Sequence, residues 1–392
     1  MRKLEATFQI VTPMFLGGAD QAAESIRPAS VKGALRFWWR ALNWSRLLEA
    51  HAGDEVQALR TLHAEEARLF GIAASDKQGG QGVFLMQVHA TSVNATKQPF
   101  TTLDSGKVYL LGMGLAKYDS AARATLLTRN ALAANGLFEI KCLFRPTVLE
   151  PDFLQIREAL LLFGLLGALG SRARHGMGSL AMTQWSEPQA LPKTIDEYKA
   201  LIKSVLGSAQ AKTEPPFTAF SALSRIDFSQ THGDVARLLN SIGTEQQMYR
   251  SFGQNGMVGR IPSERNFTDD HDLVFKAANG GRIETAPRRI VFGLPHNYFF
   301  SSTKDKADIN YSADGKSDDR RASPLFLHMH PVGDMFVAVH TLLPAKFLPD
   351  MAKIRIKARV TSSVDPKPAW DVLHSYLNRF MLNGGTGEKI HG

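Results

Sequence analysis

Apolar and polar residues alternate, or recur with a helical period, along the first half of the chain. Residues 4–12 alternate, which predicts a half-buried strand. A glycine-rich turn follows, and Pro28 and Ser30 suit the start of a long helix. A second helix is expected at 56–70, ending before Gly71. Further strands are expected at residues 82–93, 107–116 and 136–149, and a further helix at residues 151–170.

The second half resumes this mixture of strands and helices after a polar, proline-containing segment. Residues 191–215 have that composition around one short helix and are predicted to be a linker. A helix is expected at 233–252, and residues 302–321 are predicted to form an exposed loop. The last residues, 384–392, are predicted to be a flexible tail. Strands are expected at residues 216–229, 288–295, 323–330, 334–343 and 353–360.

The order of these elements predicts an α+β protein of two domains. A strand, helices, strands, a helix and a strand follow one another in residues 1–190, which is the order of a ferredoxin-like unit with helical insertions. Residues 216–383 form a second α+β unit in this interpretation. The length of 392 residues agrees with two units, since about 150 residues per domain is usual.

Composition is ordinary for a folded globular protein and narrows its setting. Hydrophobic residues make up 44% of the chain and charged residues 21%. Cys142 is the single cysteine, which excludes internal disulfides and a site built from several thiolates. The first residues lack the apolar stretch of a secretory signal, and the longest apolar run, 159–169, is too short to span a bilayer. We therefore expect a cytoplasmic protein without membrane contact.

The charge is unbalanced toward basic residues. There are 46 Lys and Arg residues against 37 Asp and Glu residues, a formal net charge of +9. Such a surface attracts polyanions, although the total does not distinguish RNA from DNA or from an acidic protein. The distribution of the basic residues is therefore more informative than their number.

The first long helix is basic along one face. No acidic residue falls between Ser25 and Leu48. Helical geometry places Trp39 on the basic face and Trp38 on the opposite, core-facing stripe. In a single-stranded RNA site, Trp39 stacks on an unpaired base while the cations contact phosphates. The alternative is a solvated helix face with Trp39 packed at the domain edge. The basic residues of this segment are Arg27, Lys32, Arg36, Arg40 and Arg46.

A glycine-rich basic loop follows the helix expected at 151–170. It includes Arg172, Arg174 and His175 between glycines at positions 170, 176 and 178. Glycine permits positive φ and close backbone approach, so exposed N–H groups in this loop are expected to cradle a phosphate that the arginines neutralise. The alternative is a helix C-cap followed by a turn. The spacing fits neither a Walker loop nor a dinucleotide-binding motif.

Four segments together resemble the RAMP superfamily. Within it, they are similar to the first-numbered RAMP subunits of the Cmr complex, the type III-B CRISPR effector. No single motif decides the matter, but the four occur in the family's order. The segments are GGADQAAESIRPASVKGALRFWWRAL (17–42), EEARLFG (65–71), LGSRARHGMGSL (169–180) and RRASPLFLHMH (320–330).

The resemblance implies a fold, a function and a set of site residues. The implied fold is two tandem ferredoxin-like domains related to RNA-recognition folds. The implied function is a non-catalytic RNA-binding subunit of an antiviral ribonucleoprotein, which contacts CRISPR guide RNA, complementary target RNA or both near the guide 3′ end, beside other RAMP subunits. The RNA-binding residues expected are Arg27, Lys32, Arg36, Trp39 and Arg40 in the helix, Arg172, Arg174 and His175 in the loop, and Arg288, Arg289, Arg320 and Arg321 in the second domain.

Catalysis is the main alternative to binding. Some RAMP relatives are metal-independent ribonucleases, so a CRISPR RNA-processing nuclease that uses His175 stays open. His175 has no evident catalytic partner in the sequence, and a histidine beside arginines is more often a phosphate contact. A third possibility is a structural scaffold whose basic helix docks on an acidic protein.

Metal chemistry finds little support in the sequence. His328 and His330 lie on one face of an expected strand, but no third ligand accompanies them at a typical spacing. Asp269, Asp270 and Asp272 fall in a segment expected to be a polar loop. Common hydrolase motifs such as HExxH and GxSxG are absent. We expect no metal, no cofactor and no enzymatic activity.

Overall fold

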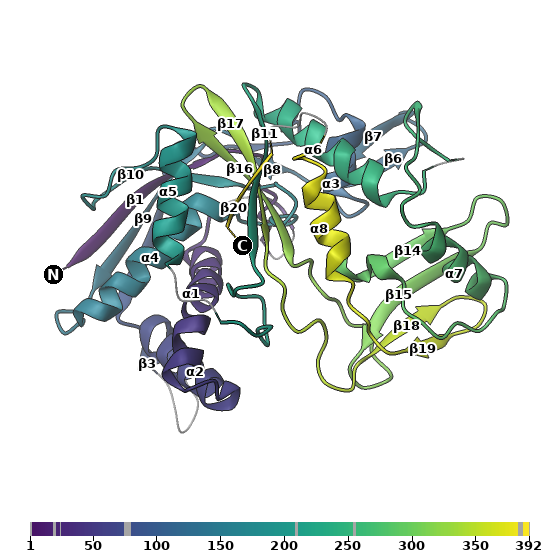
Figure 1. The fold of residues 1–392 in the computed structure, drawn as a ribbon. Coiled ribbons are helices and arrows are strands. Elements are labelled where there is room, and N and C mark those ends of the chain that lie inside the picture. The colour runs from purple at the N-terminus through teal and green to yellow at the C-terminus, as the bar shows by residue number, and fades with distance from the viewer. Residues whose placement is uncertain are drawn as a thin grey trace.

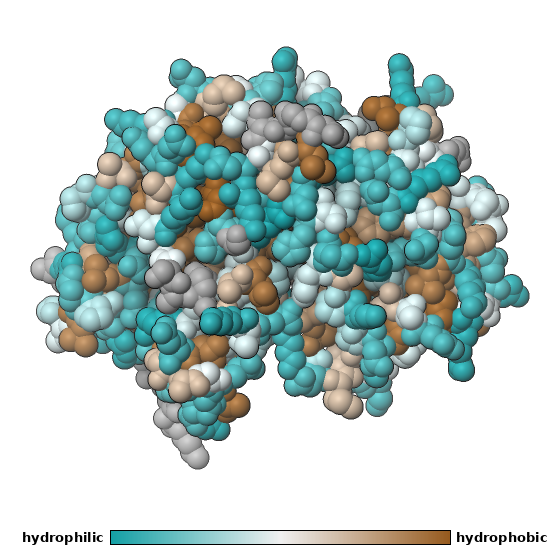
Figure 2. All heavy atoms as spheres, in the orientation of Figure 1, coloured by the Kyte–Doolittle hydropathy of each residue, from teal (hydrophilic) through white to brown (hydrophobic). Residues whose placement is uncertain are grey.

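The computed structural model describes residues 2–18, 21–23, 25–73, 80–207, 211–253, 256–382 and 387–391. These residues form two four-stranded sheets packed against helices, and a third four-stranded sheet lies in a separate lobe (Figure 1). The surface seen in Figure 2 is mostly hydrophilic, with small separate hydrophobic patches. No helix in the described part of the chain is both long and apolar enough to cross a membrane.

The first sheet is ferredoxin-like. Its strands run antiparallel in the order β10-β1-β9-β4, so the fourth strand in the chain lies beside the first and the second lies at the far edge. The apolar residues of β1 are buried beneath the helices while its polar residues are partly exposed, as the alternation predicted. The elements are β1 (Lys3–Ile10), α1 (Pro28–Ala50), α2 (Glu55–Phe70), β4 (Phe84–Ala90), β9 (Leu137–Phe144), α4 (Glu150–Leu166) and β10 (Leu180–Trp185).

The second sheet repeats this topology. Its order is β16-β17-β11-β20, in which the last strand again lies beside the first. The predicted pair of tandem ferredoxin-like domains is therefore confirmed. The predicted flexible tail is wrong at residues 388–391, because they form the edge strand β20. The elements are β11 (Arg225–His232), α6 (Val235–Arg250), β16 (Leu325–Val332), β17 (Met335–Leu342), α8 (Trp370–Asn378) and β20 (Glu388–His391).

Two insertions into the second domain build the third lobe. One insertion lies between α6 and β16 and the other between β17 and α8, and their strands pair in the order β14-β15-β18-β19 (Figure 1). The predicted loop at 302–321 is wrong where it contains β15, and the polar segment around Asp270 begins a helix. The predicted strand at 288–295 begins as a short 3₁₀ helix. The elements are α7 (Thr268–Ala278), η1 (Arg288–Phe292), β14 (His296–Phe299), β15 (Lys306–Ser312), β18 (Lys353–Lys357) and β19 (Ser362–Val364).

Two further helices differ in how well the sequence predicted them. The strand expected at 107–116 is wrong, since this region contains α3 (Ser105–Leu111). The short helix expected in 191–215 is present as α5 (Ile195–Leu206), and its Tyr198 is fully buried, so this segment is part of the core. The remaining strands are β2 (Gly71–Ile72), β3 (Gly80–Gln81), β5 (Ala95–Thr96), β6 (Ala116–Asp119), β7 (Ala124–Leu127), β8 (Ala131–Leu132), β12 (Met257–Val258) and β13 (Ile261–Pro262).

The glycine-rich loop joins the two ferredoxin-like halves. The backbone N–H of Leu327 in β16 donates to the carbonyl of Arg174 at 3.0 Å, and His175 forms a parallel bridge with Leu327. The N–H of Met329 donates to Oγ of Ser179 at 3.1 Å. The loop is thus attached to the second sheet along several residues, and its opposite side faces a cleft.

Candidate nucleic-acid interface

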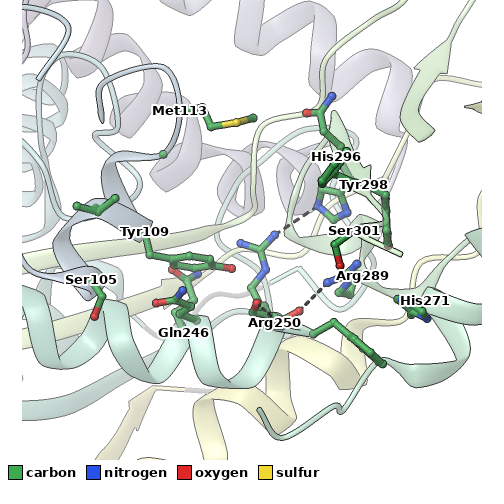
Figure 3. Close-up of a pocket in the computed structure, with 18 of the residues that line it drawn as sticks. Ser105, Tyr109, Met113, Gln246, Arg250, His271, Arg289, His296, Tyr298 and Ser301 are labelled. Atoms are coloured by element: carbon green, nitrogen blue, oxygen red, sulfur yellow. Dashed lines mark hydrogen bonds between the residues drawn. The ribbon is translucent and has the colours of Figure 1, made fainter. Parts of the chain in front are cut away.

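A cleft of about 1350 Å³ lies where the loop, the end of α6 and the third lobe meet (Figure 3). Figure 3 shows Arg250, Arg289 and His296 together on one side, while Tyr109 and Gln246 lie on the other. Among the described residues, Asp272 is the one carboxylate that lines this cleft. The cationic and imidazole side chains that line it are Arg172, His175, Arg250, Arg265, His271, Arg289 and His296.

Glycines allow the loop to pack this closely between the two halves. Gly176 has φ +80°, and a Cβ there would lie 2.9 Å from Cδ2 of Leu239. Gly178 has φ +63°, and a Cβ there would lie 2.0 Å from the carbonyl oxygen of Leu169. Larger residues at these positions would force the loop away from both domains.

The loop backbone does not form the expected phosphate cradle at three of its positions. The N–H groups of Ser171 and Gly178 donate at 2.9 Å to the carbonyls of Phe15 and Pro13, respectively. The N–H of Met177 donates to the carbonyl of Arg172 at 3.3 Å. That part of the expectation is wrong, because these donors are already satisfied inside the protein. The loop contributes side chains to the cleft instead.

Arg172 is the loop residue that carries charge into the cleft. It adopts a left-handed backbone conformation with φ +63°, and its guanidinium lies beside Gly112. Burial lowers the pKa of Arg172, and the nearby charges of Arg250 and Arg320 lower it further. No carboxylate pairs with Arg172 within the described part of the chain.

Arg250, at the last position of α6, is a second cation without an acidic partner among the described residues. Its Nη2 lies 3.4 Å from Nε2 of His296, and its Cζ lies 4.2 Å from the ring centre of Phe292. Burial lowers the pKa of Arg250. The two arginines come from different domains, so the cleft combines unneutralised charge from both halves of the molecule.

Arg289 completes the cationic side of the cleft. Its Nη1 donates to the carbonyl oxygen of Arg250 at 2.6 Å, and its Cζ lies 4.8 Å from the ring centre of Tyr298. The nearest carboxylate belongs to Asp270, at 3.8 Å from Nε of Arg289 to Oδ2. Arg289 is therefore fixed by a carbonyl, a ring and a distant acid.

Two histidines of the cleft, His175 and His296, have pKa values that are lowered by their surroundings. Burial, followed by the charges of Arg172, Arg250 and Arg174, lowers the pKa of His175 to about 3. Burial also lowers the pKa of His296 well below its usual value, and Arg250 and Arg289 add to this effect. The arginines therefore supply positive charge that these two histidines do not.

The basic helix α1 differs from its sequence prediction at Trp39. This side chain is 0% exposed, its Nε1–H donates to Oε1 of Gln155 at 2.9 Å, and its ring meets Phe70 edge-on. The prediction that Trp39 faces RNA is wrong, because α2 and α4 cover that side of α1. Trp38 is buried as predicted, at 3% exposed.

The cations of α1 have partners that the helix itself does not supply. Nε of Arg36 and Nη1 of Arg40 lie 3.0 Å and 2.7 Å from the same oxygen of Glu66 on α2. Lys32 is half-buried above the ring of Phe84, and burial, then Arg36, lowers its pKa. The lack of acidic residues within the helix segment therefore does not leave Arg36 and Arg40 without a neutralising partner. Arg46 likewise pairs with Glu65 at 2.8 Å, and exposed Arg27 donates to the carbonyl of Gly17 at 3.1 Å.

The other predicted arginines are divided between structural and exposed positions. Arg174 donates to the carbonyl of Ser323 and lies 4.4 Å above the ring of Phe326, and burial lowers its pKa to about 10. Arg321 is partly buried and forms a backbone bridge with Leu294. Arg288 is exposed and pairs with Asp371, while exposed Arg320 pairs with no carboxylate in the described residues. Of the predicted residues, Arg172, His175 and Arg289 thus line the cleft and Arg320 lies near Arg172, while the others do not line the cleft.

His328 and His330 share a face of β16, as predicted, but inside the core. Nε2 of His328 lies 3.2 Å from Nδ1 of His330, and the ring of His330 stacks on Tyr198 with centres 4.0 Å apart. Burial lowers the pKa values of both histidines. Within the described ranges, no group of three or more potential metal-ligating side chains is present.

The open face of the first sheet is not a basic surface. RNA-recognition domains of the RRM type bind bases on aromatic residues of such a face. Here Lys141 lies 3.4 Å from both Glu5 and Glu139, and Lys3 lies 3.0 Å from Glu5. These pairs neutralise one another, which leaves the cleft as the stronger candidate.

Sequence reasoning missed Arg250, Arg265 and Tyr109. Arg250 ends an amphipathic helix, where an arginine is ordinary because it interacts favourably with the helix dipole. Tyr109 lay in a segment that was expected to be a strand. No local pattern distinguishes these residues, since they come from segments that are distant in sequence and meet only in the folded chain.

Residues 7–181 match the RAMP superfamily, which confirms the predicted resemblance over the first domain.

The particular relatives are Cmr proteins. The CRISPR system Cmr subunit Cmr1-2 of Pyrococcus furiosus is 25% identical over 190 residues, which are 47% of this chain and 97% of that protein. The crystal structure of Cmr1 from Pyrococcus furiosus in its apo form covers 100% of this chain and 99% of its own, with 18% identity and a TM-score of 0.56. A chain in the type III-B Cmr-beta complex bound to cognate target RNA covers 87% of this chain and 94% of its own, with 12% identity and a TM-score of 0.49.

Proposed function

We propose that the chain is a non-catalytic RNA-binding subunit of a type III-B (Cmr) CRISPR ribonucleoprotein. It holds guide or target RNA in the cleft, near the guide 3′ end and beside other RAMP subunits. The RAMP match and the similarity to a Cmr subunit support membership of such a complex. The chemistry of the cleft supports RNA as the ligand.

One observation carries the proposal: Arg172 and Arg250 face the same cleft and neither has a carboxylate partner within the described residues. A partly buried guanidinium without an anion costs free energy, and a phosphate offsets that cost through charge-assisted hydrogen bonds. Arginine donates in a planar fork that fits phosphate oxygens. The sugar–phosphate backbone of an RNA strand running along the cleft is therefore a suitable ligand.

The remaining predicted residues have secondary places in this proposal. Exposed Arg320 lies close enough to Arg172 to lower its pKa, so it extends the cationic path. Arg36 and Arg40 contact RNA only after exchanging Glu66 for a phosphate, which makes their contribution small. Lys32 and Arg27 belong to that same weaker surface.

The test is RNA binding by the purified full chain, followed by fluorescence anisotropy of a labelled single-stranded RNA over a range of salt concentrations. Arg172→Ala with Arg250→Ala is expected to weaken binding on the order of 30-fold and to reduce the salt slope by about one unit per arginine. Arg36→Ala with Arg40→Ala is the matched control, expected to weaken binding less than about threefold. Equal effects from both pairs would contradict the assignment of the cleft.

Ribonuclease activity is the second candidate because His175 lies in the cleft among arginines. A general base works best with a pKa near the working pH, and His175 is far below that range. Incubation of labelled RNA without metal, using the native chain and His175→Ala, separates the two functions. Cleavage that disappears in the variant while binding persists would replace the binding proposal.

A further inference from the structure

Asp270 controls the backbone from which Arg289 enters the cleft. Its carboxylate is 3% exposed and lies in the first turn of α7. Oδ1 accepts the backbone N–H of Arg288 at 2.7 Å, and Oδ2 accepts the backbone N–H of Arg289 at 2.8 Å. Because both oxygens accept N–H groups, the side chain is bound as a carboxylate. It joins α7 to the start of η1.

The side chain of Arg289 is held by contacts with two other elements. Its Nη1 donates to the carbonyl of Arg250, and Tyr298 lies beneath its guanidinium. The first contact ties it to α6 and the second to β14. With the backbone held by Asp270, these contacts place the guanidinium at the wall of the cleft, near Arg250 and Tyr298 (Figure 3).

We propose that Asp270 is a positioning residue for anion binding in the cleft, so that a carboxylate which repels RNA strengthens RNA binding by holding Arg289 in place. This inference rests on the proposed function. The carboxylate of Asp270 lies 3.8 Å from Nε of Arg289, measured to Oδ2, which is beyond hydrogen-bonding distance. Asp270 positions Arg289 mainly through its hydrogen bonds with the backbone N–H groups of Arg288 and Arg289, and less through the ion pair.

Asp272, two residues further along α7, provides a comparison within the same helix. Its side chain is 70% exposed, lines the cleft and pairs with Nδ1 of His271 at 2.9 Å. It fixes no arginine among the described residues. Both aspartates add negative charge close to the RNA path, but only Asp270 organises a cation. If only electrostatic repulsion mattered, neutralising either aspartate would strengthen RNA binding. If Asp270 positions Arg289, neutralising Asp270 weakens RNA binding while neutralising Asp272 strengthens it.

The experiment compares Asp270→Asn and Asp272→Asn in the full chain by anisotropy with labelled single-stranded RNA at low salt. Asp272→Asn is expected to bind about twofold more tightly, because it removes a repulsive charge. Asp270→Asn is expected to bind about fivefold more weakly, because an amide cannot accept both N–H groups. In Arg289→Ala, the further change Asp270→Asn is expected to have no additional weakening effect.

Folding and function are separated by further measurements. Circular dichroism and thermal melting establish that each variant is folded, and Asp270→Glu, which keeps the charge but shifts the oxygens, is expected to weaken binding as Asp270→Asn does. Tighter or unchanged binding by Asp270→Asn, with weaker binding by Arg289→Ala, would overturn the positioning role alone. Native chain that does not bind RNA, or that binds equally well without Arg172 and Arg250, would overturn the proposed function itself.

Discussion

Two regions of this molecule are rich in arginine, and they differ in what neutralises them. On α1, Arg36 and Arg40 share Glu66 of the neighbouring helix. In the cleft, Arg172 and Arg250 pair with no carboxylate of the described residues. The helix looked the more basic of the two because the sequence from Ser25 to Leu48 contains no acid. Charge available to a ligand depends on neighbours in space, and here the less conspicuous region keeps more of it.

The largest expected effect tests whether the α1 region serves packing, because it concerns the stability that Trp39 contributes. Trp39→Ala removes a fully buried ring from the core between α1, α2 and α4, so we expect a loss of about 3–5 kcal/mol of unfolding free energy. Trp39→Phe keeps most of the packing and loses the hydrogen bond to Gln155, with an expected loss of about 1–2 kcal/mol. Urea unfolding followed by fluorescence measures both. A stable Trp39→Ala with reduced RNA affinity would restore Trp39 as an RNA contact.

The expected effect of intermediate size concerns the pH dependence of stability and involves His175, one of the histidines that line the cleft. The pKa of His175 is lowered to about 3 in the folded chain, so below pH 6.5 the unfolded chain takes up a proton that the folded chain does not. Stability from this residue is present above that pH and is lost as the pH falls, by about 1.4 kcal/mol per pH unit. His175→Gln is expected to reduce the stability difference between pH 7 and pH 5, measured by denaturant unfolding. An unchanged difference would show that His175 is accessible to protons in the folded chain.

The smallest expected effect sharpens the comparison directly. Glu66→Gln removes the shared partner of Arg36 and Arg40 and should make α1 resemble the cleft. We expect RNA affinity to rise by up to about threefold and stability to fall by less than about 1 kcal/mol, since the pair is partly exposed. Anisotropy titrations and thermal melts measure the two changes. Unchanged affinity would remove the α1 cations from the RNA path.

Much of the fold could be predicted because the patterns were local. The alternation of β1 and the period of α2 each predict one element, and the order of such elements gives the ferredoxin-like topology. The segment that contains α3 was misassigned because a short apolar run fits both a strand and a buried helix. The lobe strand β15 was missed because its polar, partly exposed residues resemble a loop.

The site was harder to predict because its parts are distant in sequence. Of the residues predicted to bind RNA, Arg172, His175 and Arg289 line the cleft. Arg250 has no distinguishing neighbours in the chain. Trp39 was misplaced because helical geometry assigns one face to the core and the opposite face to solvent. In the structure, α1 is covered by the sheet on one side and by helices on another, so Trp39 is buried as well. Glu66, which decides how much charge α1 offers, lies 26 residues from Arg40.

The attachment of the glycine-rich loop to β16 has a mechanical consequence. Since Arg174 and Ser179 bond to Leu327 and Met329, the two halves of the molecule cannot rock apart without breaking those bonds. The separation between Arg172 and Arg250 is therefore set before any ligand arrives. Such a preorganised pair of arginines binds a ligand without the free-energy cost of closing the cleft. It also distinguishes ligands by the spacing between their phosphates as well as by their charge.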